Sequence, residues 1–269
     1  MPYLRINGTE YYYELHGSGD ETLVFSHGFL MDSEMFRYQI PYWSRFRQVL
    51  VFDWRGQGKS PPSAGGYDME NLYRDTVELL KALQLHKVHW IGVSMGGFIG
   101  LRLAARNPDL IQSLIAADTT DEAEKPLNKI KWGSLAWIFK LFGPAPVTKG
   151  IQKALFGETK RRDPSFRPIM DEYARKWKLL DRNAAFRTAW AIFNRPSLTQ
   201  ETPLIRIPVK VVVGEEDLSR TLEESRAMAR RIPGASLSVV PKAGHSSPLE
   251  QPESFNQITA AFLTEISRR

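Results

Sequence analysis

The sequence contains no cysteine, and it also has few of the features that mark membrane or secreted proteins. Without cysteine, disulfide bonds and thiolate metal sites are excluded, and the redox state of the compartment stays open. No run of about 18 apolar residues occurs, so no transmembrane helix is expected. The N-terminal stretch MPYLRINGTE lacks the apolar core of a signal peptide. These absences predict a cytoplasmic protein.

The net charge of +6 is concentrated in one part of the chain. Residues 119–202 hold 16 lysines and arginines against 9 acidic residues, and the rest of the chain holds 20 against 21. The basic residues are scattered, and no nucleic-acid-binding motif accompanies them. A solvated cationic face is therefore favoured over a nucleic-acid surface, with attraction of an anionic substrate as a further possibility.

Short apolar runs alternate with helical patterns outside this block. The runs lie at 22–26, 48–53, 87–93, 113–118, 209–214 and 237–241. Near-continuous apolar runs are typical of a parallel sheet that helices cover on both faces. Residues 3–16 read as a hairpin with Asn7-Gly8 as its turn. The sequence thus predicts an α/β fold with a mainly parallel central sheet.

Residues 119–202 interrupt this alternation, because they contain helical patterns and 11 aromatic residues but no clear strand. We expect them to form a helical lid inserted into a core of residues 1–118 and 203–269. In the helix expected at 127–142, one face carries Leu127, Ile130, Trp137, Ile138 and Leu141. Its lysines also suit a membrane-surface helix. The favoured interpretation is that the helix is part of the lid over the sheet and docks onto the core by this face.

Four glycines surround one serine in HWIGVSMGGFIG, residues 89–100. A phosphate-binding P-loop would need a lysine after the last glycines, and a dinucleotide-binding turn has a different spacing. The stretch does fit G-x-S-x-G, from Gly92 to Gly96. A serine at the tip of a tight strand-to-helix turn has a strained backbone and close neighbours, so both flanking positions must be nearly free of side chain. Ser94 is the predicted nucleophile.

A serine hydroxyl becomes nucleophilic when a base takes its proton and an acid orients that base. Among the five histidines, His245 lies in a loop directly after the last expected strand, at the same sheet edge as Ser94. Asp217 follows the penultimate strand at that edge, and Asp118 is its competitor. We therefore predict Ser94, His245 and Asp217 as a catalytic triad.

An oxyanion needs two N–H donors that point to where negative charge develops. Gly28 in FSHGF allows an unusual backbone, so the N–H of Phe29 can point into the site. The N–H of Met95, at a helix N-terminus, is expected to be the second donor. His27 is assigned a structural role in shaping this loop. No metal ligand cluster occurs, and neither a metal nor another cofactor is expected.

The sequence resembles the α/β-hydrolase superfamily over nearly its full length. The matching segments are FSHGF, DWRGQGKS (53–60), GVSMGG, VVVGEED and AGHSSPLEQPESF. The resemblance implies an α/β-hydrolase fold with the lid after the sixth strand, and the order Ser94, Asp217, His245 is the one this family uses.

Details of these motifs separate the subfamilies. Dehalogenases and epoxide hydrolases of the family carry aspartate at the Ser94 position, and proline iminopeptidases usually have tryptophan at the Met95 position. The C–C bond hydrolases share Ser-Met-Gly-Gly but usually have asparagine and tryptophan where this chain has Val93 and Ser246. The segment GHSSPLEQPESF is most similar to small esterases and lactonases, including enol-lactonases and acyl-homoserine lactonases.

We therefore expect a hydrolase of a small-molecule carboxylic ester or lactone with a mainly apolar acyl group. Leu30, Trp137 and Trp190 are the residues expected to line its pocket. The alternatives are a C–C bond hydrolase, a ligand receptor that keeps the triad without turnover, and a lipase acting at a lipid surface. The natural substrate and the oligomeric state stay open.

Overall fold

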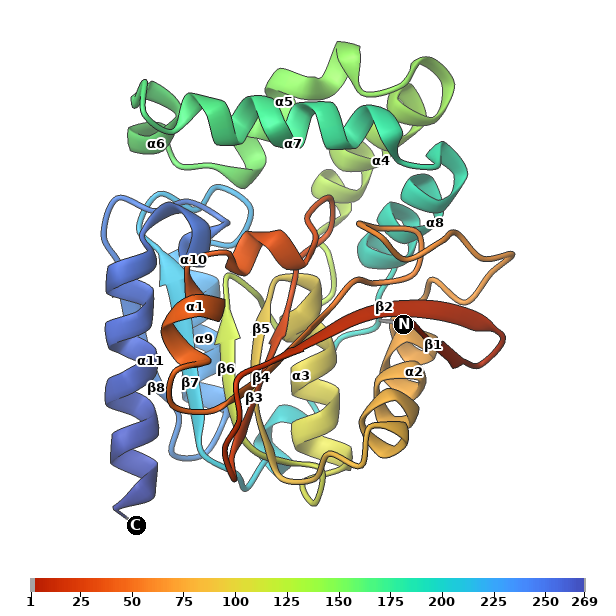
Figure 1. Ribbon diagram of the computed structural model, residues 1–269. Helices are drawn as coiled ribbons and strands as arrows, with labels where there is room; N and C mark the ends of the chain where they lie inside the picture. The colour runs from red at the N-terminus through yellow and green to blue at the C-terminus, as the bar shows by residue number, and fades with distance from the viewer. Residues whose placement is uncertain (1–2, 269) are drawn as a thin grey trace.

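The computed structural model describes residues 3–268, and in these residues an eight-stranded sheet carries helices on both faces (Figure 1). The strands are β1 (Tyr3–Ile6), β2 (Thr9–His16), β3 (Thr22–Ser26), β4 (Gln48–Phe52), β5 (Val88–Val93), β6 (Ile111–Ala117), β7 (Val209–Gly214) and β8 (Ser236–Val240). Their order in the sheet is β1-β2-β4-β3-β5-β6-β7-β8. Only the pairs β1–β2 and β2–β4 are antiparallel among these described strands. The predicted fold class is confirmed.

Helices and short 3-10 turns connect these strands. Those that pack around the sheet are η1 (Ser33–Phe36), α1 (Gln39–Trp43), α2 (Met69–Ala82), α3 (Met95–Arg106), η3 (Thr202–Leu204), α9 (Leu222–Arg231), α10 (Ser247–Glu250) and α11 (Pro252–Ser267). No helix within residues 3–268 is both long enough and apolar enough to span a bilayer.

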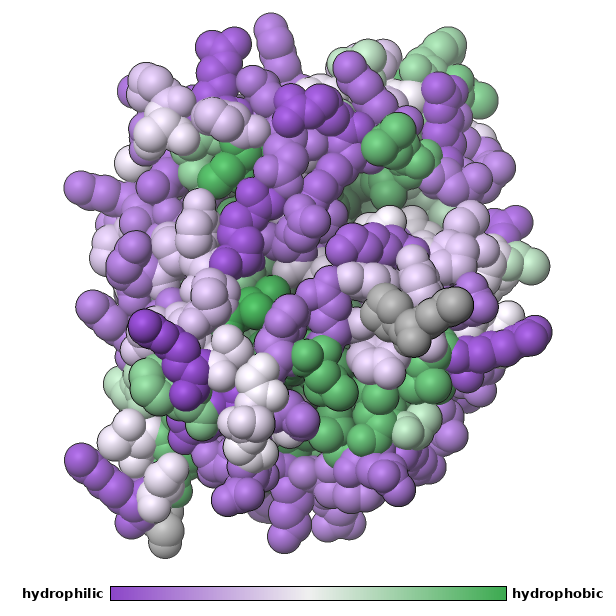
Figure 2. Space-filling view, in the orientation of Figure 1, coloured by the Kyte–Doolittle hydropathy of each residue, from purple (hydrophilic) through white to green (hydrophobic). Residues whose placement is uncertain are grey.

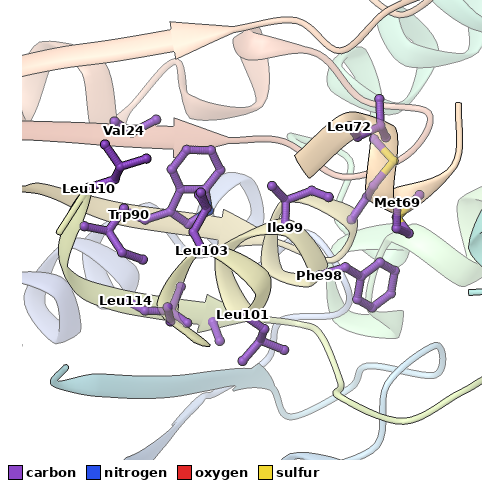
Figure 3. Close-up of a cluster of buried hydrophobic side chains, with 14 of the residues drawn as sticks. Val24, Met69, Leu72, Trp90, Phe98, Ile99, Leu101, Leu103, Leu110 and Leu114 are labelled. Carbon is purple, nitrogen blue, oxygen red and sulfur yellow. The ribbon is translucent and has the colours of Figure 1, made fainter. Parts of the chain in front are cut away.

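Alternate residues of the buried strands point into two separate cores, one on each face of the sheet. In β3, Val24 belongs to the core that includes residues of α2 and α3, whereas Leu23 and Phe25 belong to the core that includes α11. Figure 3 shows part of the first core, which includes Trp90 of β5 and side chains of α2 and α3. Because both faces are buried, the strands read as near-continuous apolar runs in the sequence.

Between β6 and β7 the chain forms helices that lie above the carboxyl ends of the strands (Figure 1). They are α4 (Pro126–Phe142), η2 (Ala145–Val147), α5 (Thr148–Leu155), α6 (Glu158–Arg162), α7 (Arg167–Leu179) and α8 (Arg182–Phe193), and we call them the cap helices. This segment is the helical insertion after the sixth strand that the fold class predicted. Its limits as a domain, residues 119 and 202, stay a prediction.

The expected orientation of α4 is wrong. Leu127, Ile130 and Leu141, which were expected to dock onto the core, are exposed to solvent by 81%, 69% and 60%. The buried residues of this helix are instead Gly133, Ala136 and Phe139. Two of these three are small residues, which allow the helix backbone to approach its neighbours closely. Since α4 is apolar on both sides, its periodicity alone could not show which side faces inward.

Candidate active site

Ser94 lies at a sharp turn between β5 and α3 with a left-handed backbone, φ = 52°. Such a φ is strained for a residue with a side chain, and it lifts the hydroxyl out of the line of the strand. Gly92 and Gly96, on either side of Ser94, have no room for a side chain. A Cβ on Gly92 would clash with the carbonyl of Gly96, and a Cβ on Gly96 would clash with the carbonyl of Ser26. These contacts account for the G-x-S-x-G pattern.

Ser94, His245 and Asp217 form one chain of hydrogen bonds at the carboxyl edge of the sheet. His245 Nε2 lies 2.9 Å from Ser94 Oγ, and His245 Nδ1 lies 2.8 Å from Asp217 Oδ2. Asp217 follows β7 and His245 follows β8, so the parallel topology brings both loops to the turn after β5. The structure thus brings together the three residues that the sequence singled out as a triad.

The environment of the two partners favours a basic His245. The second carboxylate oxygen of Asp217 accepts the backbone N–H groups of Ser219 at 2.7 Å and Arg220 at 2.9 Å, which fixes the orientation of the carboxylate. Burial by itself would lower the pKa of His245, but the nearby carboxylate of Asp217 outweighs burial and raises that pKa above its ordinary value. The proton that His245 would take from Ser94 is therefore stabilised.

Asp118 lies close to this chain but contacts different groups. Its carboxylate accepts the N–H of Gly214 at 2.9 Å and both the N–H (3.1 Å) and the hydroxyl (2.7 Å) of Ser247. Burial and the neighbouring charge of Asp217 raise the pKa of Asp118 to about 7. Within residues 3–268, the carboxylate that is hydrogen-bonded to His245 belongs to Asp217 and not to Asp118. Asp118 holds the loops on either side of the triad.

The two expected oxyanion donors flank Ser94. Within the described residues, neither the N–H of Phe29 nor that of Met95 donates a hydrogen bond to the protein. The loop that carries Phe29 passes very close to the serine, because a Cβ on Gly28 would lie 3.2 Å from Ser94 Cβ. His27 is fully buried, donates through Nδ1 to the Gly28 carbonyl and accepts the N–H of Trp54, consistent with the structural role expected for it.

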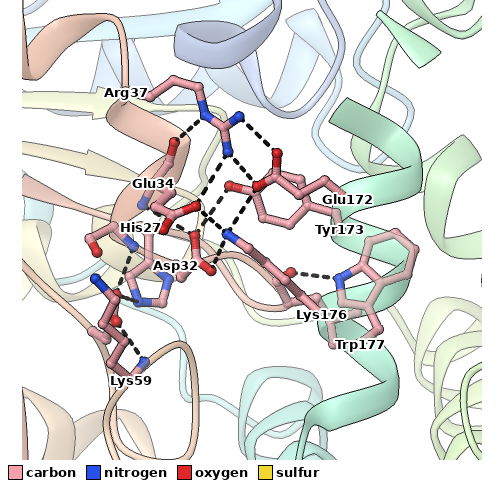
Figure 4. Close-up of polar contacts among 12 residues, drawn as sticks. His27, Asp32, Glu34, Arg37, Lys59, Glu172, Tyr173, Lys176 and Trp177 are labelled. Carbon is pink, nitrogen blue, oxygen red and sulfur yellow. Dashed lines mark hydrogen bonds and ion pairs between the residues drawn. The ribbon is translucent and has the colours of Figure 1, made fainter. Parts of the chain in front are cut away.

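A polar cluster fixes the loop after β3 against α7 (Figure 4). Lys176 of α7 lies 2.8 Å from the carboxylate of Asp32 and 2.7 Å from that of Glu34. The indole N–H of Trp177 donates to the carbonyl of Leu30 at 2.7 Å. Leu30 itself has a left-handed backbone with φ = 63°. These contacts tie one side of the cap to the loop that presents the N–H of Phe29.

A cavity of about 140 Å³ opens between the triad and the cap helices. Ser94, His245, Phe29 and Leu30 line its floor. Its upper part is mainly apolar and is lined by side chains of the cap, including Trp132, Leu135 and Phe139 of α4, Val147, Ile151 and Leu155, and Phe186 of α8. Of the three expected pocket residues, only Leu30 lines this cavity.

Trp137 and Trp190 do not line the cavity, which corrects that part of the prediction. They are exposed by 45% and 50%, and both pack on Phe186, with ring centroids 4.6 and 5.9 Å away. Trp190 instead borders a surface groove beside residues 64–70. The expectation rested on aromatic size, whereas the turn of each helix directs Trp132, Phe139 and Phe186 inward.

Sequence reasoning missed a buried ionic cluster at the polar end of the cavity. Glu124 and Arg220 both line it, and Glu124 pairs with Arg220 at 2.6 Å and with Arg195 at 3.1 Å. Although burial opposes ionisation, the two guanidinium groups hold the pKa of Glu124 at about 2. The three residues lie far apart in the sequence, in segments with many other charges, so no local signal marks them.

Sequence reasoning also missed Glu250, which joins the cap to the loop of His245. The buried carboxylate accepts the N–H groups of Gly157 (2.7 Å), Gly244 (3.0 Å) and Ser246 (3.1 Å). Burial raises the pKa of Glu250 to about 8. Because Gly244 and Ser246 flank His245, this carboxylate helps to set the position of the imidazole.

No group of three or more potential metal ligands occurs within residues 3–268.

Comparison with known proteins agrees with this geometry. Residues 21–252 match the family model described as the alpha/beta hydrolase fold. The chain is 28% identical to a putative carbamate hydrolase, RutD, of Stutzerimonas stutzeri, over 94% of this chain and 97% of that protein. It is also 28% identical to 3-oxoadipate enol-lactonase 2 of Acinetobacter baylyi, over 93% and 92% of the two chains. A solved structure of a thermophilic esterase from Thermogutta terrifontis superposes with a TM-score of 0.90 at 28% identity, covering 99% of each chain.

Proposed function

Because this chain belongs to the alpha/beta hydrolase fold family, we propose that it hydrolyses a carboxylic ester or lactone through an acyl-enzyme on Ser94. The main support is the hydrogen-bonded chain from Asp217 through His245 to Ser94, which ends in a mainly apolar cavity. The relatives named as an enol-lactonase and an esterase favour the same reaction class.

The first half of the reaction forms the acyl-enzyme. With its proton on Nδ1 held by Asp217, His245 accepts the hydroxyl proton of Ser94 at Nε2 while Oγ attacks the substrate carbonyl. The N–H groups of Phe29 and Met95 then hold the oxyanion of the tetrahedral intermediate. Collapse breaks the bond to the leaving alcohol, which takes the proton back from His245.

The second half repeats these steps with water. His245 removes a proton from a water molecule, the hydroxide attacks the acyl carbon, and the same two N–H groups stabilise the new oxyanion. Ser94 Oγ leaves with the proton from His245. For a lactone, the alcohol released in the first half stays attached to the acyl chain, so the product is a hydroxy acid. No metal or other cofactor takes part in this scheme.

The cap helices would select the acyl group. Trp132, Phe139 and Phe186 surround the cavity above Ser94, so a mainly apolar acyl chain of modest length fits there. We treat residues 119–202 as the lid and the remaining residues as the core. A small-molecule substrate and a cytoplasmic location remain predictions.

Covalent labelling tests the proposed nucleophile. A fluorophosphonate should add once per chain, at Ser94, as mapped by mass spectrometry. The Ser94→Ala variant should take up no label and lose about three or more orders of magnitude in kcat, because only binding and the oxyanion donors remain. Activity should persist in the presence of chelators. Near-normal turnover by the alanine variant would overturn the mechanism.

A kinetic panel separates the alternatives. It should contain aryl esters graded by acyl length, lactones of several ring sizes, an aryl carbamate and a vinylogous 1,5-diketone. Ester or lactone turnover with the highest kcat/KM supports the proposal. Preferential cleavage of the diketone would identify a C–C bond hydrolase, and a single slow turnover of every ester would identify a receptor.

A further inference from the structure

The outward side of α4 presents a row of large apolar side chains to solvent. This row, here called the outer stripe, consists of Leu127, Ile130, Trp137 and Leu141 on one side of the helix, with the exposed Ser134 between Ile130 and Trp137. Single exposed leucines are common on protein surfaces, but four large apolar side chains exposed on one side of one helix are not. Figure 2 shows apolar patches on the cap, at the upper right of the molecule, bordered by hydrophilic side chains.

None of the four side chains of the outer stripe lines the cavity, and only Trp137 among them packs on a residue that does, Phe186. Trp132, Leu135 and Phe139 line the cavity from the same helix, and at 100° per residue they lie on the side opposite the stripe. The cap is also fastened elsewhere, through the contacts of α7 with the loop after β3. The stripe is therefore an apolar surface that neither the core nor the proposed substrate covers.

Unpaired lysines surround this apolar surface. Between Pro126 and Gly157 the chain has no aspartate or glutamate but five lysines, at 129, 131, 140, 149 and 153. Within residues 3–268, none of the five lies within 4 Å of a carboxylate oxygen. The helical rotation places Lys131 on one side of the stripe and Lys129 and Lys140 on the other. Lys140 Nζ lies 4.8 Å from the ring centre of Trp137 and 4.5 Å from that of Phe186, so this lysine lies where the stripe meets α8.

We propose that the outer stripe docks on an anionic lipid surface. Its aliphatic and indole groups would enter the boundary between headgroups and acyl chains, while the lysines reach the phosphate groups on both sides. A second copy of the chain fits less well, because two stripes packed face to face would bring together Lys129, Lys131 and Lys140 from each copy. A nucleic acid would pair with the lysines but leave the leucines in water. Docking would hold the cavity, on the inner side of the same helix, next to a source of apolar esters.

Vesicle flotation tests this inference independently of any hydrolase activity. The full chain should float with phosphatidylglycerol vesicles at low salt, bind phosphatidylcholine vesicles at least about tenfold more weakly, and lose affinity as salt rises. The double variant Ile130→Ser/Leu141→Ser should bind phosphatidylglycerol at least about tenfold more weakly, because two exposed aliphatic groups no longer insert. A matched control, Phe46→Ser/Leu204→Ser, removes equally exposed apolar groups from the sheet layer and should bind as the wild type does.

Other results would overturn the inference. Equal binding to both lipids, no binding to phosphatidylglycerol, or unchanged binding of the stripe variant would each do so. Sedimentation of the wild type as a dimer that the stripe variant dissociates would show that a second copy covers the stripe instead. Both double variants should keep wild-type turnover of a short soluble ester, which shows that they are folded. If the wild type itself hydrolyses no ester, circular dichroism checks the fold, and vesicle binding is judged separately.

Discussion

Replacing Asp217 by asparagine should reverse the proton arrangement of His245 while leaving the fold intact. One carboxylate oxygen of Asp217 accepts two backbone N–H groups, at 2.7 and 2.9 Å, so the asparagine oxygen should take that position. The asparagine amide would then face Nδ1 of His245, where Asp217 Oδ2 now lies at 2.8 Å. Because an amide N–H only donates, Nδ1 must give up its proton and Nε2 must carry it.

With the proton on Nε2, His245 points a donor at Ser94 Oγ and cannot accept the hydroxyl proton. The variant also loses the negative charge that raises the pKa of His245. The same change in other serine hydrolases lowers kcat by about 10⁴, which corresponds to about 5.4 kcal/mol of transition-state stabilisation. We expect a loss of that size in pre-steady-state acylation by an activated aryl ester, with KM changed by less than about threefold.

Asp118→Asn is the matched comparison, because it removes a buried carboxylate from the same region without touching His245. It should cost about 1–3 kcal/mol in denaturant unfolding, since a carboxylate that accepts bonds from Gly214 and Ser247 is replaced. Its kcat should stay within about tenfold of wild type. The assignment of Asp217 would be refuted if Asp118→Asn abolished acylation while Asp217→Asn, shown to be folded, kept most of it.

The remaining predictions concern pH, substrate size and stability. Because the pKa of His245 is raised, kcat/KM should fall as the pH drops through a midpoint above about 6.5; a midpoint well below this value would contradict the Asp217 contact. Phe139→Ala should raise the ratio of long-chain to short-chain kcat/KM, since it enlarges the cavity, whereas Trp137→Ala on the same helix should leave that ratio unchanged. Glu124→Gln should destabilise the protein by about 3–5 kcal/mol in thermal or denaturant unfolding, because it leaves buried Arg195 without its counter-charge; a change within error would mean that the cluster is solvated.

The arrangement around Ser94 was predictable because parallel topology determines it. Residues that directly follow β5, β6, β7 and β8 must meet at one edge of the sheet, so strand order selected His245 as the partner of Ser94 and left Asp217, which we favoured, and Asp118 as the candidate acids. The need for glycine at positions 92 and 96 was also predictable, because backbone atoms lie so close to both positions that no side chain fits.

The cap was less predictable, because packing between helices determines which side of each helix faces inward. The pattern of α4 offers two apolar sides, and the small residues Gly133 and Ala136 lie on the buried one. The larger residues of the other side were expected to be buried, and they are exposed. The role of Glu250 could not be predicted for another reason. One of its partners is Gly157, 93 residues away in the sequence, and no local sequence pattern indicates such a contact.

The hydrogen bonds of Glu250 also limit how the cap helices could be replaced by those of a related protein. Gly157 packs against Ala243 and Gly244, which directly precede His245. A Cβ on Gly157 would lie 2.8 Å from the backbone nitrogen of Gly244 and 2.6 Å from a carboxylate oxygen of Glu216. A transplanted segment with any side chain at this position would clash with Gly244, the residue before His245. Exchanges that replace only α4 or only α8 leave the contacts of Gly157 unchanged, so under the proposed mechanism they should alter substrate preference without moving Ser94, His245 or Asp217.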